Sequence, residues 1–275
     1  MIGSRLLFSG YGRGFKSRPL HAGFLGQDTL LVHDEAHLEP AFQKLIEAIT
    51  KEQERCKDFM KLRIMEMTAT ARSDGDSELP LFTDRDRKHP EARKRIEAKK
   101  GIILHPINDE KEIAKEIANC ALNHRGSNQA ILIYARSVEN VFKIVEQLNK
   151  EGLHDQVQTL TGTLRGLERD ALAINDPVFA RFMPIAEDKQ EKGEPRTGTV
   201  YLVCTSAGEV GVNISGDHLV CDLTPFESMA QRFGRVNRFG KSDSQIDIIH
   251  ANFQNIATSK ATNSESIEAE PGNKN

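Results

Sequence analysis

The stretch Thr29–His37 reads TLLVHDEAH and is the starting point for interpreting the whole chain. Its apolar run, Leu30–Val32, is long enough for one buried strand, and the carboxylates of Asp34 and Glu35 follow directly. Because ligands bind outside the carboxyl ends of strands in an open parallel sheet, acids placed there can reach a bound nucleotide. The first acid of such a pair can hold Mg²⁺, and the second can activate the attacking water. The alternative is an ordinary strand followed by an acidic helix start.

Two further motifs follow in order along the chain. Thr68-Ala69-Thr70 ends an alternating stretch, Leu62–Met67, that we predict to be a strand. Much later, Gln231–Arg238 reads QRFGRVNR, a Q-R-x-G-R-x-x-R array of guanidinium groups. A basic helix on the protein surface would also produce this array. Together with the D-E-A-H tetrapeptide, however, the three ordered motifs resemble those of superfamily 2 helicases of the DEAH type.

Composition limits the class of protein. The chain has 275 residues, enough for one large domain or two ordinary ones, and a net charge of −3. Nucleic-acid binding would therefore depend on local basic patches. The four cysteines are far apart and form no CxxC pair, so we expect buried thiols in a reducing cytoplasm and no zinc site. No apolar run approaches the roughly 20 residues needed to cross a bilayer, so we expect no membrane association.

Alternating strand and helix patterns predict an α/β fold with parallel sheets and helices on both faces. Helical spacing of apolar residues predicts a first helix over Ala41–Cys56. Ser137 is predicted to cap a later helix, and Asn175–Gly198 is predicted to be an insertion or a mobile loop. The second βα series has expected strands at 102–104, 130–135, 157–160, 200–204, 219–222 and 246–249, and expected helices at 109–123, 137–149 and 165–173.

We expect four segments: a partial first lobe at 1–75, a basic linker at 76–100, a second lobe at 101–254 and a disordered tail at 255–275. The basic residues of Met1–Gln27 could touch a phosphate backbone, although an ordinary solvated loop explains them equally well. The basic run Arg85–Lys100 could do the same, but we favour a solvated helix face.

The wider pattern is similar to that of the CRISPR-associated helicase of type I interference systems. The similarity rests on GSRLLF, RPLHAGFLGQDTLLVHDEAHL, TSAGEVGVNI and QRFGRVNRFG, which begin at residues 3, 18, 205 and 231. It covers nearly the whole chain up to about Ala251 and implies two RecA-like lobes, the first incomplete, with ATP between them. It also implies ATP-driven movement on single-stranded DNA in antiviral defence, with the CRISPR surveillance complex as a partner.

The resemblance assigns nucleotide chemistry to six residues: Asp34, Glu35, His37, Gln231, Arg235 and Arg238. The two acids would hold Mg²⁺ and activate water, and His37 with Gln231 would link the nucleotide state to lobe closure. The two arginines would reach the γ-phosphate, because a planar, permanently charged fork stabilises the transferring phosphoryl group. Arg232 would instead pair within its own lobe.

Other roles also follow from the resemblance. Thr68, Ala69 and Thr70 would couple hydrolysis to strand movement. The nucleic-acid backbone would contact Thr161, Gly162, Arg165, Thr205 and Ser206, and nucleotide binding would involve Glu209, Gly211 and Asn213. Hydroxyl and backbone N–H groups at strand ends suit phosphate contacts that ignore base sequence, although a simple turn also explains 161–163. Two positions depart from the family pattern, because Asn213 stands where Asp is common and Asn237 where Gly is common.

One expected motif is missing. The sequence contains no G-x-x-x-x-G-K-[ST] loop, and Gly10–Lys16 lacks the required spacing. A nuclease-type His-Asp pair set in a long helical region is missing too. We therefore expect a fragment that hydrolyses no ATP alone and needs an N-terminal helicase half. The alternatives are a non-catalytic nucleic-acid-binding remnant and a fragment of an RNA helicase of the same superfamily.

Overall fold

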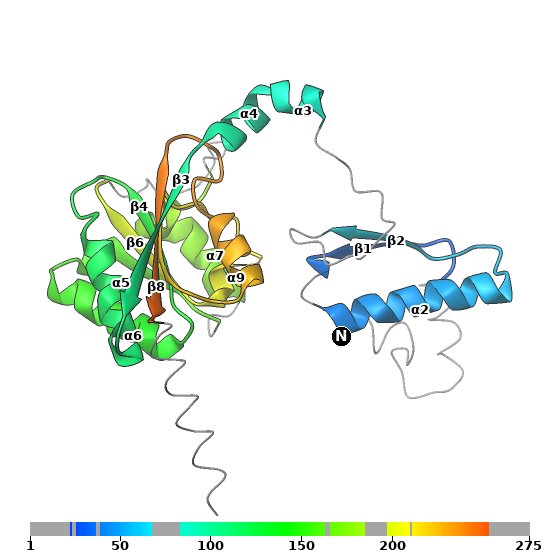
Figure 1. The fold of residues 1–275 in the computed structure, drawn as a ribbon, viewed down its shortest axis with the longest axis horizontal. Coiled ribbons are helices and arrows are strands. Elements are labelled where there is room, and N and C mark those ends of the chain that lie inside the picture. Colours follow the sequence, from blue (N-terminus) through cyan, green and yellow to red (C-terminus); the bar gives the residue numbers. More distant parts are fainter. Residues whose placement is uncertain are drawn as a thin grey trace, which may run out of the picture. The chain divides into compact units, whose positions relative to one another are not determined.

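The computed structural model describes residues 23, 26–36, 39–67, 83–162, 166–184, 197–209 and 211–252 (Figure 1). The chain divides into two compact units, Met1–Leu79 and Pro80–Asn275, and each is considered by itself. Each unit contains a parallel sheet, which confirms the predicted α/β class. None of the helices in the described part of the chain has the length and apolar character that crossing a membrane requires.

The first unit consists of β1 (Leu30–Asp34), α2 (Pro40–Cys56) and β2 (Arg63–Met67). The two strands are parallel and in register from Leu30 beside Arg63 to Asp34 beside Met67. The helix is joined to the loops around the strands through Gln53, whose buried amide donates to the Gly26 carbonyl at 2.6 Å and accepts from the Leu62 N–H at 2.9 Å. This pairing satisfies backbone groups that would otherwise be buried without partners.

One face of this small sheet is exposed. Leu30, Val32 and Met65 are 59%, 49% and 51% exposed, although the run containing the first two was predicted to be a buried strand. That part of the prediction is wrong, because α2 covers only the face that carries His33, whose ring packs edge-on against Phe42 at 5.0 Å. Parallel sheets are normally covered on both faces, so the exposed apolar face is unusual.

The second unit contains a six-stranded, entirely parallel sheet with the strand order β3-β8-β7-β4-β6-β5. Its strands lie close to the predicted positions, and the central ones consist almost wholly of buried apolar residues, as expected for strands covered on both faces. The strands are β3 (Lys100–Ile107), β4 (Ala130–Tyr134), β5 (Val157–Leu160), β6 (Val200–Cys204), β7 (His218–Asp222) and β8 (Ser244–Ala251).

Helices cover both faces of this sheet, as predicted (Figure 1). Side chains of α5 and α6 form one core with alternate residues of the central strands, and α8 and α9 contribute to the core on the opposite face. Ser137 caps α6 as predicted, because its side chain accepts from the Asn140 N–H. The helices that follow β3 are α5 (Ile113–Leu122), α6 (Val138–Lys150), α7 (Gly166–Asn175), α8 (Pro177–Ala180) and α9 (Phe226–Phe233). The short 3₁₀ helices in the same part of the chain are η3 (Glu110–Glu112), η4 (His154–Gln156) and η5 (Ser206–Gly208).

Two sequence predictions need correction. The segment predicted as an insertion or mobile loop contains α8, and its Val178, Phe179 and Phe182 are buried in the core. Because the segment also contains three prolines and many charged residues, its short apolar cluster was not recognised in the sequence. Residues 185–196 lie outside the described part of the chain. Among the cysteines, three are buried as expected but Cys56 is exposed at the end of α2.

The basic run before the large sheet forms two short helices, α3 (Asp84–Lys88) and α4 (Pro90–Glu97). Neither contains a buried residue, so their basic side chains are exposed, which is compatible with both a solvated face and a phosphate contact. Exposed ion pairs within α4 join Arg93 to Glu97 at 2.7 Å and Lys94 to Glu91 at 2.8 Å. The basic stretch before residue 23 and the expected tail lie outside the described residues.

A histidine at the start of β7 predicts that the stability of the second unit depends on pH. The His218 ring stacks on His124 with centroids 4.6 Å apart, and its Nδ1 accepts from the Gln245 N–H at 2.9 Å. Burial lowers the pKa of His218, and the charge of His124 lowers it further. Protonation at Nδ1 would also break the hydrogen bond from Gln245.

We therefore expect the free energy of unfolding to fall as the pH drops below about 6.5, because the unfolded chain then binds the proton more readily than the folded one. Urea titrations at about pH 7.5 and about pH 5.5 measure this difference. His218→Gln should make it smaller, whereas His154→Gln, at an exposed position, should not. An unchanged pH dependence in His218→Gln would contradict the assignment.

Candidate functional site

In the first unit, the acidic motif lies at the carboxyl end of β1, beside the end of β2. Asp34 pairs in register with Met67, the last residue before the Thr68–Thr70 motif. Asp34 is exposed, and its Oδ1 accepts from the Glu35 N–H at 2.9 Å. Glu35 has a φ of 51°, a left-handed conformation that is uncommon for residues other than glycine. His37 and Thr68–Thr70 lie outside the described residues, so their roles stay predictions.

In the second unit, the two segments predicted to contact nucleic acid lie side by side. Thr161 follows β5 and Thr205 follows β6, and these strands are neighbours in the sheet. The Thr205 N–H donates to the Leu160 carbonyl at 3.1 Å, which joins the two strand ends directly. Ser206 and Gly162 are exposed at this carboxyl edge, whereas Thr205 is buried and its side chain accepts from the Ala207 N–H at 3.5 Å. Arg165 lies outside the described residues.

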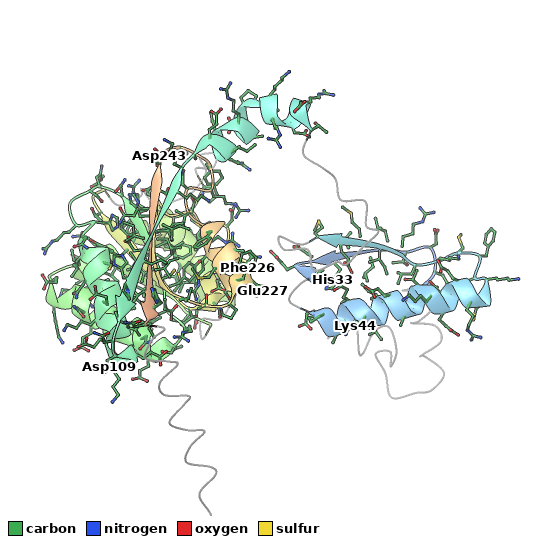
Figure 2. The ribbon with its side chains drawn as sticks, in the orientation of Figure 1. His33, Lys44, Asp109, Phe226, Glu227 and Asp243 are labelled. Atoms are coloured by element: carbon green, nitrogen blue, oxygen red, sulfur yellow. The ribbon has the colours of Figure 1, made fainter. Side chains whose placement is uncertain are left out.

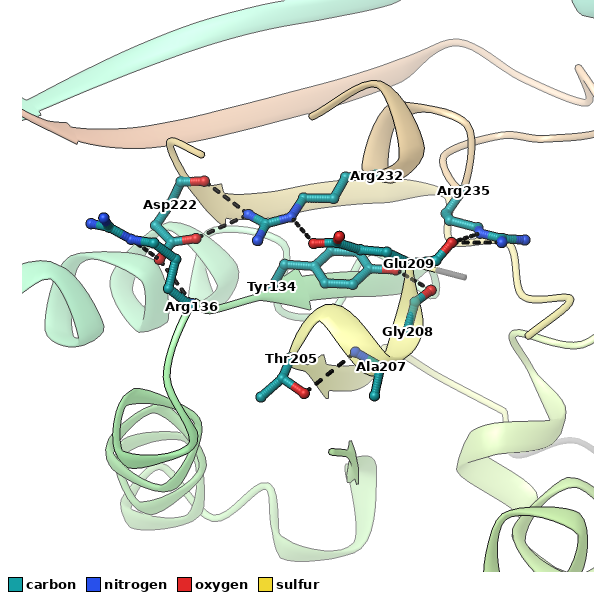
Figure 3. A network of polar contacts seen from close by, with 9 residues as sticks. All are labelled: Tyr134, Arg136, Thr205, Ala207, Gly208, Glu209, Asp222, Arg232 and Arg235. Atoms are coloured by element: carbon teal, nitrogen blue, oxygen red, sulfur yellow. Dashed lines mark hydrogen bonds and ion pairs between the residues drawn. The ribbon is translucent and has the colours of Figure 1, made fainter. Parts of the chain in front are cut away.

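The arginine array begins inside α9, where Arg232 is buried with 2% of its surface exposed. Its Nε donates to Glu209 Oε1 at 2.8 Å, and its Nη1 donates to Asp222 Oδ1 at 2.9 Å (Figure 3). The same Nη1 also donates to the Asp222 carbonyl at 2.9 Å, and the guanidinium carbon lies 5.1 Å from the centre of the Tyr134 ring. Arg232 thus pairs within its own unit, as predicted.

Asp222 extends this network to the end of a neighbouring strand. Its side chain is fully buried, and Oδ2 accepts from the Arg136 N–H at 2.9 Å and from Arg136 Nε at 3.2 Å (Figure 3). The Tyr134 hydroxyl donates to the Gly208 carbonyl at 2.7 Å. Sequence reasoning missed Asp222, Arg136 and Tyr134. Asp222 carried one usable signal, because it is an acid that ends a predicted strand, as Asp34 does.

The next two arginines of the array differ in exposure. Arg235 is 9% exposed, and its Nε and Nη2 donate to the Glu209 carbonyl at 3.0 and 2.6 Å. Arg238 is exposed, and its Nη1 donates to Asn213 Oδ1 at 3.1 Å. Glu209 therefore holds two arginines, one with its carboxylate and one with its backbone carbonyl. The array and the segment from Glu209 to Asn213 thus form one hydrogen-bonded assembly.

The two departures from the family pattern have structural counterparts. Asn237 has a φ of 43°, a left-handed conformation that glycine adopts readily and that asparagine tolerates better than most residues. Its side-chain Oδ1 accepts from the Lys241 N–H at 2.8 Å, so it also fixes the loop that follows. Asn213 keeps an oxygen where a carboxylate is common, and that oxygen binds Arg238. Gly211, between the two assigned positions, has a φ of 77°.

Burial and ion pairing shift the pKa values of several groups in the second unit. Desolvation by itself would lower the pKa of Arg232, but its hydrogen bonds and charge interactions with Glu209 and Asp222 outweigh this effect and raise it. Burial raises the pKa of Cys221 to about 12 and that of Cys120 to about 11, so both thiols stay protonated at neutral pH. Within the described ranges no three His, Cys, Asp or Glu side chains are placed to hold a metal ion together.

Comparison with known families gives a match to part of the second unit. Residues 127–241 match the family described as CRISPR-associated nuclease/helicase Cas3, C-terminal. The matched segment contains β4 to α9, the Glu209–Asn213 segment and the complete arginine array. A search of curated protein sequences gave no significant match.

Two solved structures of T. fusca Cas3 support the fold. T. fusca Cas3 with AMPPNP matches with a TM-score of 0.57 and 14% identity over 94% of this chain and 35% of that one. T. fusca Cas3 with ADP matches with a TM-score of 0.52 and 16% identity over 81% of this chain and 30% of that one. S. cerevisiae Dbp5 bound to RNA and ADP BeF3 has a TM-score of 0.47 and 16% identity, with 88% and 58% of the two chains covered. The chain therefore spans about a third of the T. fusca chains.

Proposed function

Because residues 127–241 form a Cas3-like C-terminal helicase domain, the second lobe of a superfamily 2 helicase, we propose that this chain is the C-terminal part of an ATP-dependent DNA helicase or translocase of CRISPR interference. In this proposal it acts in the cytoplasm on single-stranded DNA, together with the CRISPR surveillance complex. The observation that carries the proposal is the hydrogen-bonded assembly of the arginine array with the segment from Glu209 to Asn213. Within this assembly Arg238 is exposed, and its hydrogen bond to Asn213 holds its side chain in place.

The proposed hydrolysis divides between the two units. Asp34 is an exposed carboxylate at a strand end, and Mg²⁺ is commonly bound through one or two carboxylates plus the oxygens of substrate phosphates. A single acid is therefore compatible with the absence of a larger ligand cluster among the described residues. Mg²⁺ would neutralise charge on the phosphates when bound. Glu35 would accept a proton from the attacking water, and Arg235 and Arg238 would stabilise the charge on the γ-phosphate.

The proposed roles in coupling and in nucleic-acid binding are also assigned to residues of both units. His37 and Gln231 would report the nucleotide state between the lobes, and Thr68 to Thr70 would transmit it to the bound strand. The register of β1 and β2 supports the second role, because Met67, the residue before Thr68 in the sequence, lies beside Asp34. Among the residues assigned to the nucleic acid, exposed Ser206 and Gly162 would offer hydroxyl and backbone groups to phosphates.

The proposal includes a polypeptide partner that completes the first lobe. Leu30, Val32, Met65 and Met67 form an apolar face on the sheet of the first unit, and all four are exposed. Two strands seldom make a stable sheet, and a parallel sheet normally has both faces covered. An upstream helicase segment carrying a phosphate-binding loop would add strands beside β1 and β2 and cover this face.

The test uses an assembly in which such an upstream segment is supplied, either fused to this chain or as a separate polypeptide. We expect DNA-stimulated ATP hydrolysis in that assembly and none with this chain alone. Glu35→Gln should abolish hydrolysis while ATP binding is retained, because it removes the base without removing Asp34. Glu39→Gln, at an exposed acid just after the motif, is the matched control and should hydrolyse ATP normally. Unchanged turnover in Glu35→Gln would refute the assignment.

A non-catalytic remnant that binds nucleic acid is the second candidate. The exposed apolar face of the first unit favours it, because a first lobe that lacks its covering elements would expose such a face. This candidate predicts that an upstream segment fails to restore hydrolysis although the chain still binds nucleic acid. A comparison of DNA and RNA strands in the same binding assay tests the remaining alternative, an RNA helicase fragment. Backbone contacts alone do not separate the two substrates.

A further inference from the structure

A groove of about 550 Å³ lies at the amino ends of β3 and β8. It is formed by α4, by the loop that follows the arginine array and by one proline: Glu91, Lys94, Phe239, Gly240, Lys241 and Pro184. In Figure 2, Asp243 marks the loop just before β8, near the end of α4. The six strands are parallel, so this groove lies at the sheet edge opposite the one that carries Thr161 and Thr205.

The loop and α4 are packed closely enough to form a fixed wall. Gly240 has a φ of 63°, and a side chain at this position would collide with the backbone of Lys94. Only glycine allows so close an approach in this conformation. The Lys99 N–H donates to Asp243 Oδ1 at 3.1 Å, which attaches the same loop to the chain just after α4.

The groove is basic and contains an aromatic ring. The guanidinium carbon of Arg95 and the Nζ of Lys241 each lie 5.9 Å from the centre of the Phe239 ring, within the range of a cation–π interaction. Residues 84–100 carry eight Lys and Arg against four Asp and Glu, so the surroundings are positive even though Glu91 pairs with Lys94. The net charge of the whole chain is −3, which makes this local excess distinctive.

We propose that this groove is a second contact site for single-stranded nucleic acid, in which Lys94 and Lys241 bind backbone phosphates and Phe239 stacks on a base. Cations that follow the backbone, combined with aromatic rings, are how proteins bind single strands without reading their sequence. An acidic peptide would use the cations but gain less from the aromatic ring. The inference rests on the proposed function in that the ligand is the strand on which the helicase would act.

The experiment measures binding of the full chain to fluorescein-labelled oligothymidylate by fluorescence anisotropy over a series of KCl concentrations. The double variant Lys94→Gln/Lys241→Gln should bind more weakly. A plot of log affinity against log salt has a negative slope, and this slope should become less steep by about 0.7 for each phosphate that is no longer neutralised. The matched control is Lys143→Gln/Lys150→Gln, which removes two exposed lysines from ion pairs on α6 and should keep the wild-type slope. Phe239→Leu should weaken binding about fivefold or more without changing the slope.

The outcomes separate this inference from the proposed function. Equal slopes for the groove variant and its control would overturn the groove, as would a full chain that fails to bind oligothymidylate. Competition by polyglutamate as strong as by unlabelled oligothymidylate would identify a protein ligand and overturn it too. Thr161→Ala/Thr205→Ala tests the opposite edge in the same assay. If that variant binds normally while the groove variants do not, the groove stands and the proposed motif edge fails; thermal unfolding checks that every variant is folded.

Discussion

Arg232→Ala is expected to lower the free energy of unfolding of the second unit by about 3–5 kcal/mol, because it leaves two buried carboxylates without their shared cation. Glu209 is 5% exposed and Asp222 is 0% exposed, so water cannot take the place of the guanidinium group. Both acids hold other parts of the carboxyl edge, since Asp222 also binds Arg136 and the Glu209 carbonyl binds Arg235. The loss should therefore spread through the loops that carry the motif residues.

The measurement is urea unfolding of the full chain, followed by a signal from the second unit. Arg125→Ala is the matched control, because this exposed arginine pairs with Glu151 at 3.5 Å and exposed pairs contribute only about 0–1 kcal/mol. Arg232→Lys should fall between the two, since a lysine keeps the charge but cannot reach both acids with a planar fork. A loss below about 1 kcal/mol for Arg232→Ala would mean that the buried pairs are not what holds α9 in place.

Arg238→Ala should have a large effect on catalysis. In the assembly with the upstream segment, turnover should fall by about 10³–10⁵-fold, as in other phosphoryl-transfer enzymes that lose an arginine finger. Arg238 is exposed and bound to Asn213, so its removal should leave folding and ATP binding nearly unchanged. Arg235→Ala should also reduce turnover, but with a measurable loss of stability, because Arg235 holds the buried Glu209 carbonyl.

Single-turnover hydrolysis and equilibrium ATP binding separate these effects. Arg238→Lys should not restore turnover, because an ammonium group cannot contact two phosphoryl oxygens in one plane. Arg125→Ala again serves as the control, with wild-type turnover expected. If Arg238→Ala hydrolyses ATP at the wild-type rate in the assembly, then the exposed end of the array is not the finger, and the proposed division of labour between the units is wrong.

The sequence by itself determined the class of the fold and most of its elements. Buried strands such as AILIY at 130–134 are apolar throughout, and amphipathic helices such as α6 begin at a residue suited to capping. These signals depend on residues near each other in the chain, so a single sequence contains them. The sequence also determined which motifs are present and in which order they occur.

Only the tertiary structure decided what holds the arginine array. The partners of Arg232 are 23 and 10 residues away in sequence, and nothing local distinguishes Asp222 from any other acid at a strand end. The exposure of individual side chains could not be predicted from the sequence either. Leu30 and Val32 are residue types that are usually buried, yet both lie on an exposed face of their sheet. The burial of Val178, Phe179 and Phe182 was missed for the same reason. Burial and ion pairing depend on which elements pack together across the fold, and local sequence patterns do not record that.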